Sequence, residues 1–284
     1  MEAALKAIIL GLVQGLTEFL PVSSKSHLIF AKDLLRLPEP GIHWAICLHL
    51  ATVVSTVAVF RREILDLLRG FGKGASITVR TGSLTEAMLR EERFRLALLY
   101  IISAIPVGLA ALFFKKPLER LFDDALLAGA VLGVTGAILW LTRCKKDPES
   151  GKPVGLRGAI VMGLAQAVAL VPGISRSGVT ISSGIFAGMK PSEAARFSFL
   201  MAVPPILGAA LLDAKEIRHA TLQSSGGFAS IAIGFVVAAV VGYFALRWLL
   251  PVIRRGNLYR FAYYCWAMGA AVMIWKGAQL LAGK

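Results

Sequence analysis

The sequence predicts an all-α polytopic membrane protein with six transmembrane helices and two re-entrant helical hairpins, arranged as an inverted repeat. Three observations support this prediction. The 284-residue chain is 56% hydrophobic with a mean hydropathy of +0.70, which is too apolar for a soluble protein of this length. Long runs without any charged residue recur along it. One eight-residue pattern also occurs twice, each time before a proline and a cluster of hydroxyl side chains.

The uncharged runs account for the six predicted spans. They approach or exceed the roughly 20 residues that a helix needs to cross a bilayer. Backbone groups in hydrocarbon must bond within their own segment, and the sequence lacks an alternating strand pattern, so we expect helices. The N-terminal apolar run is interrupted by Gln14, Thr17 and Glu18, which is not typical of a cleaved signal peptide. The runs cover residues 43–60, 96–114, 125–142, 197–212, 226–246 and 261–275.

The repeated pattern predicts the two hairpins. It is AIILGLVQ at residues 7–14 and AIVMGLAQ at residues 159–166, with five of its eight positions identical. The helix before each proline has about 16 residues, on the order of 24 Å, which is short for a span. A second short helix follows each proline. We therefore expect re-entrant hairpins at 4–37 and 158–189, with proline-kinked full spans as the alternative interpretation.

The distribution of Lys and Arg residues predicts how the chain is oriented in the membrane. The segment 61–93 carries seven Lys or Arg residues and the linker 143–157 carries five, so we expect both in the cytoplasm, the first as a loop. Three spans follow each hairpin. Because three is odd, the half 1–142 and the half 158–284 should have opposite orientations. The first hairpin then enters from outside and the second from the cytoplasm, which leaves the C-terminus outside.

The first break carries candidate catalytic residues. Gln14 and Glu18 are four residues apart and share one helix face. After the proline, Ser23 or Ser24 can cap a new helix, with Ser24 and His27 on its first turn. A carboxylate within an apolar helix is unfavourable and usually functional, although Glu18 could instead be a charge near the membrane interface.

The second break carries candidate phosphate-binding residues. Ser175, Arg176, Ser177 and Thr180 follow a proline and a glycine at a predicted helix start. Free N–H groups and the positive end of the helix dipole suit a phosphate there, and Arg176 adds a planar fork of donors. Two such helix starts would together bind a pyrophosphate. Alternatively, the serines are helix caps and Arg176 pairs with Glu18 to hold the hairpins together.

The remaining polar residues suggest no other site. A net charge of +14 would favour nucleic acid in a soluble protein, but here the charges lie mainly between spans, so we expect no nucleic-acid partner. The cysteines are scattered and form no disulfide or metal motif: Cys47, Cys144 and Cys265. Three histidines outside the clusters are interpreted as structural: His43, His49 and His219.

Both boxes resemble those of one family. Residues 14–27, QGLTEFLPVSSKSH, resemble the E/Q-x-x-x-E box and the P-V-S-S-x-G-H segment of the bacterial undecaprenyl-pyrophosphate phosphatases, the bacitracin-resistance family. Residues 172–180, PGISRSGVT, match that family's P-G-x-S-R-S-x-x-T box, and residues 196–204 are also similar. Length and spacing agree over essentially the whole chain.

The resemblance implies removal of the terminal phosphate from a C55 lipid pyrophosphate, which recycles the carrier for cell-wall glycans. It also implies a divalent cation, Mg²⁺ or Ca²⁺, and a multi-pass protein of the bacterial cytoplasmic membrane with its active site toward the outer face. The partners are then the polyprenyl pyrophosphate and the bilayer, with a homodimer left open. Two departures are visible: Gln14 takes the non-carboxylate option, and Lys25-Ser26 replaces a small pair before His27.

The residues of the first box also predict catalytic roles. A serine is a weak nucleophile that needs a base, so we predict Ser24 as the nucleophile and His27 as the base. Glu18 would orient the imidazole or contact the cation, because it is the only carboxylate in this box. Two alternatives stay open: attack by His27, and attack by a cation-bound water with Ser24 only a phosphate ligand. The phosphate-binding residues are predicted to be Arg176, Ser175, Ser177, Thr180, Ser23 and Gln14.

Two other function classes can be weighed against this one. A transporter or flippase is the main rival, because inverted repeats with broken helices are typical of transporters. The phosphatase is favoured, since a carrier needs no nucleophile and base beside Arg176. A phosphatidic-acid-type phosphatase is disfavoured, because its box needs a histidine six residues after the arginine, where this chain has Ser182.

Overall fold

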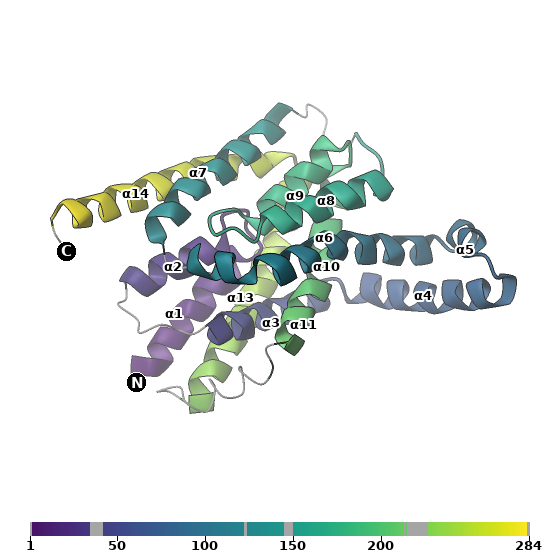
Figure 1. Ribbon diagram of the computed structural model, residues 1–284, viewed down its shortest axis with the longest axis horizontal. Coiled ribbons are helices and arrows are strands. Elements are labelled where there is room, and N and C mark those ends of the chain that lie inside the picture. The colour runs from purple at the N-terminus through teal and green to yellow at the C-terminus, as the bar shows by residue number, and fades with distance from the viewer. Residues whose placement is uncertain are drawn as a thin grey trace.

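The computed structural model describes residues 2–34, 42–121, 124–144, 150–212, 214 and 227–282 (Figure 1). Within these ranges the backbone forms helices and turns without a strand, apart from one β-bridge between Lys152 and Met189. The elements are α1 (Glu2–Thr17), α2 (Ser24–Leu34), α3 (Ile42–Val59), α4 (Arg61–Thr81), α5 (Leu84–Arg90), α6 (Glu92–Leu121), α7 (Ala125–Leu141), η1 (Thr142–Cys144), α8 (Leu156–Val168), α9 (Arg176–Phe186), α10 (Pro191–Met201), α11 (Val203–Leu212), α13 (Gly227–Arg254), η2 (Asn257–Arg260) and α14 (Phe261–Leu281).

The prediction that the six apolar runs are helical is confirmed. They coincide with α3, α6, α7, α13, α14 and the consecutive pair α10 and α11. Four described helical stretches are long and apolar enough to cross a membrane, or five when the bent pair of α3 and α4 is counted as one span. The four are Glu92–Phe114, Ala125–Cys144, Pro191–Leu212 and Phe228–Arg254. The chain is therefore an all-helical, multi-pass membrane protein.

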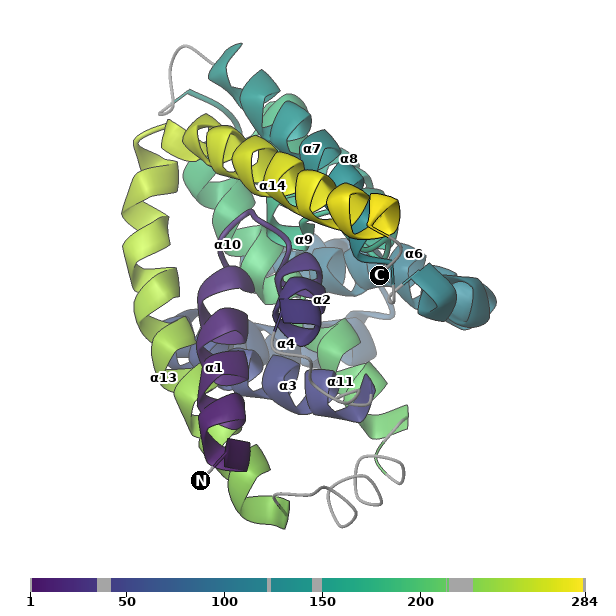
Figure 2. The ribbon, with the colours of Figure 1, turned by 90° about the vertical axis from the view of Figure 1, so that its left-hand side faces the viewer.

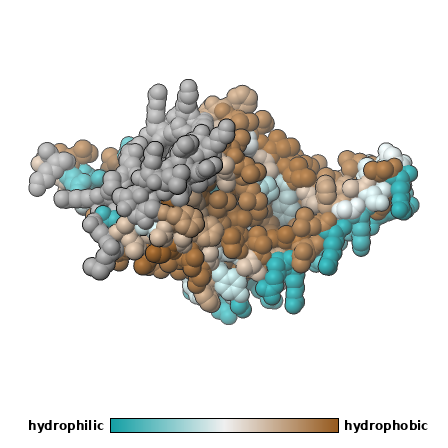
Figure 3. Space-filling model, turned by 90° about the horizontal axis from the view of Figure 1, so that it is seen from below, coloured by the Kyte–Doolittle hydropathy of each residue, from teal (hydrophilic) through white to brown (hydrophobic). Residues whose placement is uncertain are grey.

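The expectation that the segment 61–93 is a loop is wrong. Here α4 turns by 82° from α3 and packs against the start of α6, with α5 at the far end of this arm (Figure 1). Gly70 and Gly74 allow the close packing, because a Cβ at either position would clash with Arg93 or Phe94. Figure 3 shows hydrophilic atoms along one edge of the arm beside hydrophobic ones. The segment's many charges concealed this amphipathic helical period.

Both copies of the repeated pattern fold as helix, break and helix. In the first copy α1 ends before residue 18 and α2 begins at Ser24; in the second α8 ends at Val168 and α9 begins at Arg176. Figure 2 shows α1 and α2 joined by a loop that reverses the chain. Ser23 (φ 64°) and Gly173 (φ 96°) adopt left-handed backbone conformations at these reversals.

The first helix of each hairpin packs against a helix far away in the sequence. α1 lies along α13, as Figure 2 shows, and α8 lies along α6. The glycine common to both copies makes each crossing close. A Cβ at Gly11 would lie 2.6 Å from the Gly234 carbonyl oxygen, and one at Gly163 would lie 2.6 Å from the Ser103 carbonyl oxygen. The repeated glycine therefore has the same packing function in both halves.

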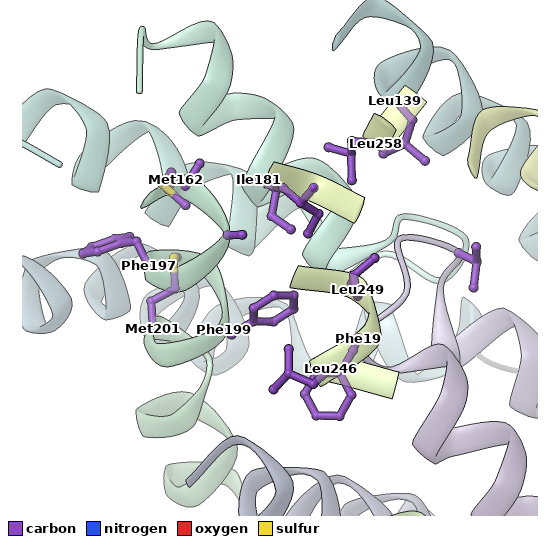
Figure 4. Packing of buried hydrophobic residues seen from close by; sticks show 14 of the residues in the cluster. Phe19, Leu139, Met162, Ile181, Phe197, Phe199, Met201, Leu246, Leu249 and Leu258 are labelled. Atoms are coloured by element: carbon purple, nitrogen blue, oxygen red, sulfur yellow. The ribbon is translucent and has the colours of Figure 1, made fainter. Parts of the chain in front are cut away.

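A hydrophobic core lies next to the first break. Figure 4 shows Phe19 beside Leu246 and Leu249 of α13, with Phe199 of α10 close by. Phe19 is 1% exposed, and its ring meets that of Phe199 edge-on at 5.8 Å between centroids. Because Phe19 directly follows Glu18, this packing fixes the backbone from which the Glu18 carboxylate extends.

We predict that Gly11→Ala and Gly163→Ala each destabilise the protein by roughly 1–3 kcal/mol, because the added methyl groups overpack two helix crossings. The measurement is thermal unfolding in detergent. Gly108→Ala is the matched control, since a Cβ there would meet no atom within 4 Å. If Gly11→Ala were as stable as Gly108→Ala, close approach would not be what the repeated glycine provides.

Candidate active site

The breaks of the two hairpins meet around one carboxylate. Glu18 extends from the end of α1, Ser24 from the start of α2, Arg176 from the start of α9, and His49 from α3. The Glu18 side chain is 5% exposed, while those of Arg176 and His49 are 18% and 20% exposed. Residues from four helices thus form a nearly closed polar cluster.

Both oxygens of Glu18 are hydrogen-bonded. Its Oε1 accepts from Nη2 of Arg176 at 2.6 Å. Its Oε2 accepts from Oγ of Ser24 at 2.7 Å and from Nε2 of Gln14 at 2.9 Å. The pairing of Arg176 with Glu18, which the sequence offered as the alternative interpretation, is therefore present, and the predicted shared face of Gln14 and Glu18 is confirmed. Charge-assisted hydrogen bonds of this kind offset the unfavourable burial of the carboxylate.

Arg176 is held at the start of α9 by its neighbours. Ser175 caps the helix, its Oγ accepting from the backbone N–H of Gly178 at 3.1 Å. Nη1 of Arg176 donates to the Ser198 carbonyl at 3.4 Å, and the Ser198 hydroxyl meets that of Thr180 at 2.6 Å. The guanidinium is thus positioned across the gap from the first hairpin.

Further hydrogen bonds fasten the second break in place. Ser177 donates its hydroxyl to the Leu20 carbonyl at 3.2 Å, which joins the two hairpins directly. Thr135 of α7 donates to the Gly173 carbonyl at 2.7 Å and accepts from the Ser175 N–H at 3.1 Å. The hydroxyls of Ser175, Ser177 and Thr180 therefore make structural contacts within the site, and phosphate binding by them stays a prediction.

Lys25 forms another link between the hairpins. Its ammonium donates to the carbonyl oxygens of Leu170 at 3.1 Å and Ala169 at 3.4 Å. These carbonyls lie just beyond the C-terminal end of α8, where the helix dipole favours a cation. The lysine that departs from the family pattern thus connects the start of α2 to the end of α8.

Ser24 contacts Glu18, and His27 is oriented elsewhere. Nδ1 of His27 lies 2.9 Å from the Ser23 carbonyl oxygen, and Nε2 lies 2.8 Å from the Tyr264 hydroxyl. Because a carbonyl can only accept, Nδ1 carries the proton and Nε2 accepts from Tyr264. The imidazole also stacks on the Tyr264 ring at 5.7 Å between centroids. The expected pairing of His27 with Ser24 is therefore absent, because tertiary packing against α14 directs the ring away.

His49 belongs to the site, which the sequence analysis missed. Its Nε2 lies 3.3 Å from Oε2 of Glu18. The interpretation of His49 as merely structural rested on its isolation from both boxes in the sequence. The only signal available was its place in an apolar run, where an ionisable side chain is usually functional. The side chain of His43 and all of His219 lie outside the described residues.

The residues also suit a hard divalent cation. Oε1 of Gln14 is buried and has no hydrogen-bond partner among the described residues. The Nε2 of the same amide donates to Oε2 of Glu18 at 2.9 Å, so Gln14 and Glu18 offer oxygen donors from neighbouring side chains four residues apart. In the described ranges, no three or more His, Cys, Asp or Glu side chains gather as metal ligands. A cation such as Mg²⁺ would therefore complete its shell with waters and phosphate oxygens.

This arrangement supports transfer of a phosphoryl group. A hydroxyl at a helix start donates to a carboxylate that can accept its proton, and a guanidinium lies on the other oxygen of the same carboxylate. Ser24 offers a nucleophile, Glu18 a base, and Arg176 a partner for phosphate oxygens.

Comparison with known proteins agrees with this chemistry. The family model described as "Bacitracin resistance protein BacA" matches residues 7–271. The undecaprenyl-diphosphatase of Desulfatibacillum aliphaticivorans is 38% identical over 272 residues, covering 95% of this chain and 98% of the relative. Those of Christiangramia forsetii and Methanobrevibacter smithii are each 39% identical, covering 96% and 95% of this chain and 98% and 96% of the relatives.

Proposed function

The chain belongs to the bacitracin resistance protein BacA family, and we propose that it is an undecaprenyl-diphosphatase, as its relatives are named. It removes the terminal phosphate of undecaprenyl pyrophosphate, yields undecaprenyl phosphate, and so recycles the lipid carrier and gives resistance to bacitracin. One observation carries the mechanism: Ser24 donates to Oε2 of Glu18 at 2.7 Å while Arg176 binds Oε1 at 2.6 Å.

Ser24 is the nucleophile and Glu18 the base. The Ser24 oxygen attacks the terminal phosphorus as its proton passes to Oε2 of Glu18. The bond between that phosphorus and the bridging oxygen breaks, and undecaprenyl phosphate leaves with the electron pair. Water then attacks the phosphoserine, a proton returns to the Ser24 oxygen from Glu18, and inorganic phosphate is released. In this scheme Glu18 takes the role that the sequence assigned to His27.

Arg176 interacts with both the Glu18 carboxylate and the substrate phosphate. In the free protein its guanidinium neutralises Glu18, which keeps the carboxylate buried without an unpaired charge. The phosphate oxygens of the substrate compete for the same guanidinium, whose planar fork can bind two oxygens at once. As Arg176 turns toward the phosphate, Glu18 loses a cationic partner and becomes a better proton acceptor.

A divalent cation is the proposed cofactor. When bound with the substrate it neutralises charge on the pyrophosphate. Gln14 and Glu18 would hold it through Oε1 of Gln14 and the carboxylate, as the unpartnered amide oxygen supports. Because one of the two is a neutral amide, affinity in the absence of substrate should be low.

For the membrane arrangement we propose six spans and two re-entrant hairpins in opposite orientations, in the bacterial cytoplasmic membrane, with the active site toward the outer face. The helix packing supports related halves, since α1 with α13 and α8 with α6 are equivalent pairs under the repeat. The two halves are residues 1–142 and 158–284, joined by the linker 143–157. A homodimer stays a prediction from the resemblance alone.

The nucleophile is tested by Ser24→Ala in detergent solution, measuring phosphate release from undecaprenyl pyrophosphate. Turnover should fall by roughly 1,000-fold or more, because the covalent step is lost, while lipid binding persists. Ser26→Ala is the matched control, as its hydroxyl contacts Ser23 and not Glu18. Should Ser24→Ala keep a tenth of the activity, direct attack by water is the better mechanism.

The same assay separates hydrolysis from transport. The broken hairpins also suit a transporter or flippase for a polyprenyl phosphate. No membrane is crossed in detergent, so phosphate release there can only be hydrolysis. Wild-type protein that binds the lipid pyrophosphate but releases no phosphate would favour the transporter.

Turnover should require a divalent cation, and Gln14→Glu should lower the concentration needed for half-maximal activity, because a second carboxylate joins the ligands. Added Mg²⁺ should also raise the melting temperature of Gln14→Glu more than that of the wild type without substrate. Full turnover in excess chelator would contradict the cofactor proposal.

Opposite orientation of the hairpins is tested by cysteine labelling. In a Cys144→Ser background, an impermeant maleimide should label Ala3→Cys in intact cells, and Ser150→Cys only after permeabilisation. The native Cys47 and Cys265 are buried and should stay unlabelled. Labelling of both new cysteines from the same side would contradict the inverted repeat.

A further inference from the structure

We propose that Lys25 is a positioning residue of this reaction, which holds the start of α2 so that the Ser24 hydroxyl points at Glu18. This inference rests on the proposed function. Its basis is a contact that crosses from one hairpin to the other. The Lys25 side chain donates to the backbone carbonyl oxygens of Leu170 at 3.1 Å and Ala169 at 3.4 Å, in the break of the second hairpin.

The repeat gives Lys25 a counterpart in the second hairpin. The two copies are offset by 152 residues, so Ser24 is equivalent to Arg176. Both of these side chains donate to Glu18, at 2.7 Å and 2.6 Å. Lys25 is likewise equivalent to Ser177, whose hydroxyl donates to a backbone carbonyl in the break of the first hairpin at 3.2 Å. Each second helix therefore begins with one residue at the carboxylate and one that fastens the opposite hairpin.

The backbone just before Ser24 needs such support. Ser23 has a φ of 64°, and no other described residue except glycine has a positive φ. A left-handed conformation is unfavourable for serine and persists only when surrounding contacts hold it. The equivalent Ser175 has a φ of −73° and carries no such strain. Lys25, two residues after Ser23, provides a contact that comes from outside the first hairpin.

Two other side chains hold α2 further along its length. His27 stacks against α14 near the middle of the first two turns, and Asp33 near the other end of α2 pairs with Lys276 of α14 at 2.7 Å. Without the donor of Lys25, α2 would stay packed at these points. Its first turn would lose the contact that faces the second hairpin, so the Ser24 hydroxyl would be less well aligned for proton transfer.

The test compares Lys25→Met and Lys25→Arg in the phosphate-release assay. Lys25→Met keeps an unbranched side chain but removes its donors, so kcat should fall by roughly 10- to 100-fold while KM changes by less than about threefold. Lys25→Arg should recover most of the loss, because a guanidinium also donates to two carbonyl oxygens. Lys276→Met is the matched control at the other end of α2. It should lower the melting temperature and leave kcat per folded molecule unchanged.

A second measurement follows residue 24 without any turnover. In a Cys144→Ser background, Ser24→Cys places a thiol at the break, and the other native cysteines are buried. Adding Lys25→Met should raise the rate at which a small maleimide labels residue 24 by roughly 10-fold or more, because the first turn of α2 opens more often. Adding Lys276→Met should leave this rate unchanged.

Several results would overturn the proposal. Normal kcat in Lys25→Met would show that the contact is only structural, and a raised KM with normal kcat would show that Lys25 binds the substrate. An equal loss in Lys25→Arg, or an unchanged labelling rate of residue 24 in Lys25→Met, would also contradict it. Absence of phosphate release by the wild-type protein would instead overturn the proposed function, and the labelling rates would still report whether Lys25 fixes Ser24.

Discussion

The ion pair between Glu18 and Arg176 is the interaction on which the site depends. It joins residues 158 positions apart and brings the breaks of the two hairpins together inside the protein. A lone carboxylate or guanidinium would be strongly unfavourable in this environment, so each residue makes the other tolerable. The remaining contacts of Ser24, Gln14 and Lys25 are arranged around this pair. In the proposed mechanism, a phosphate that enters the site competes with Glu18 for Arg176, and this competition couples substrate binding to release of the carboxylate.

The repeated pattern is used symmetrically for packing and asymmetrically for chemistry. Gly11 and Gly163 make equivalent close helix crossings. Four residues after the shared glutamine, however, the first copy has Glu18 and the second has Leu170. Gln166 accordingly has no carboxylate partner, and its amide atoms are buried without hydrogen bonds among the described residues. The two related halves therefore contribute one carboxylate and one guanidinium to a single site.

The parts of the fold and site encoded by neighbouring residues could be predicted from the sequence. The apolar runs gave the helices, and the proline breaks gave the hairpins and the Glu18 cluster. The orientation of His27 could not be predicted, because it depends on Tyr264, 237 residues away. The place of His49 likewise depends on how α3 packs against α1 and α13. In 61–93, clustered charge outweighed the helical period, so an amphipathic helix was mistaken for a loop.

The crossing of α1 with α13 has a consequence for biosynthesis. The main packing partner of α1, the helix α13, is encoded from Gly227 onward, whereas the first hairpin is complete at Leu34. At ribosomal rates of about 5–20 residues per second, the first hairpin waits roughly 10–40 s for its packing partner. For the earlier part of that interval, until residue 176 is synthesised, Glu18 also lacks Arg176, so a polar helix end lies in or near the membrane without its counter-ion. The first hairpin must therefore stay in a temporary position during membrane insertion. Its packing against α13 follows only after α13 has been inserted.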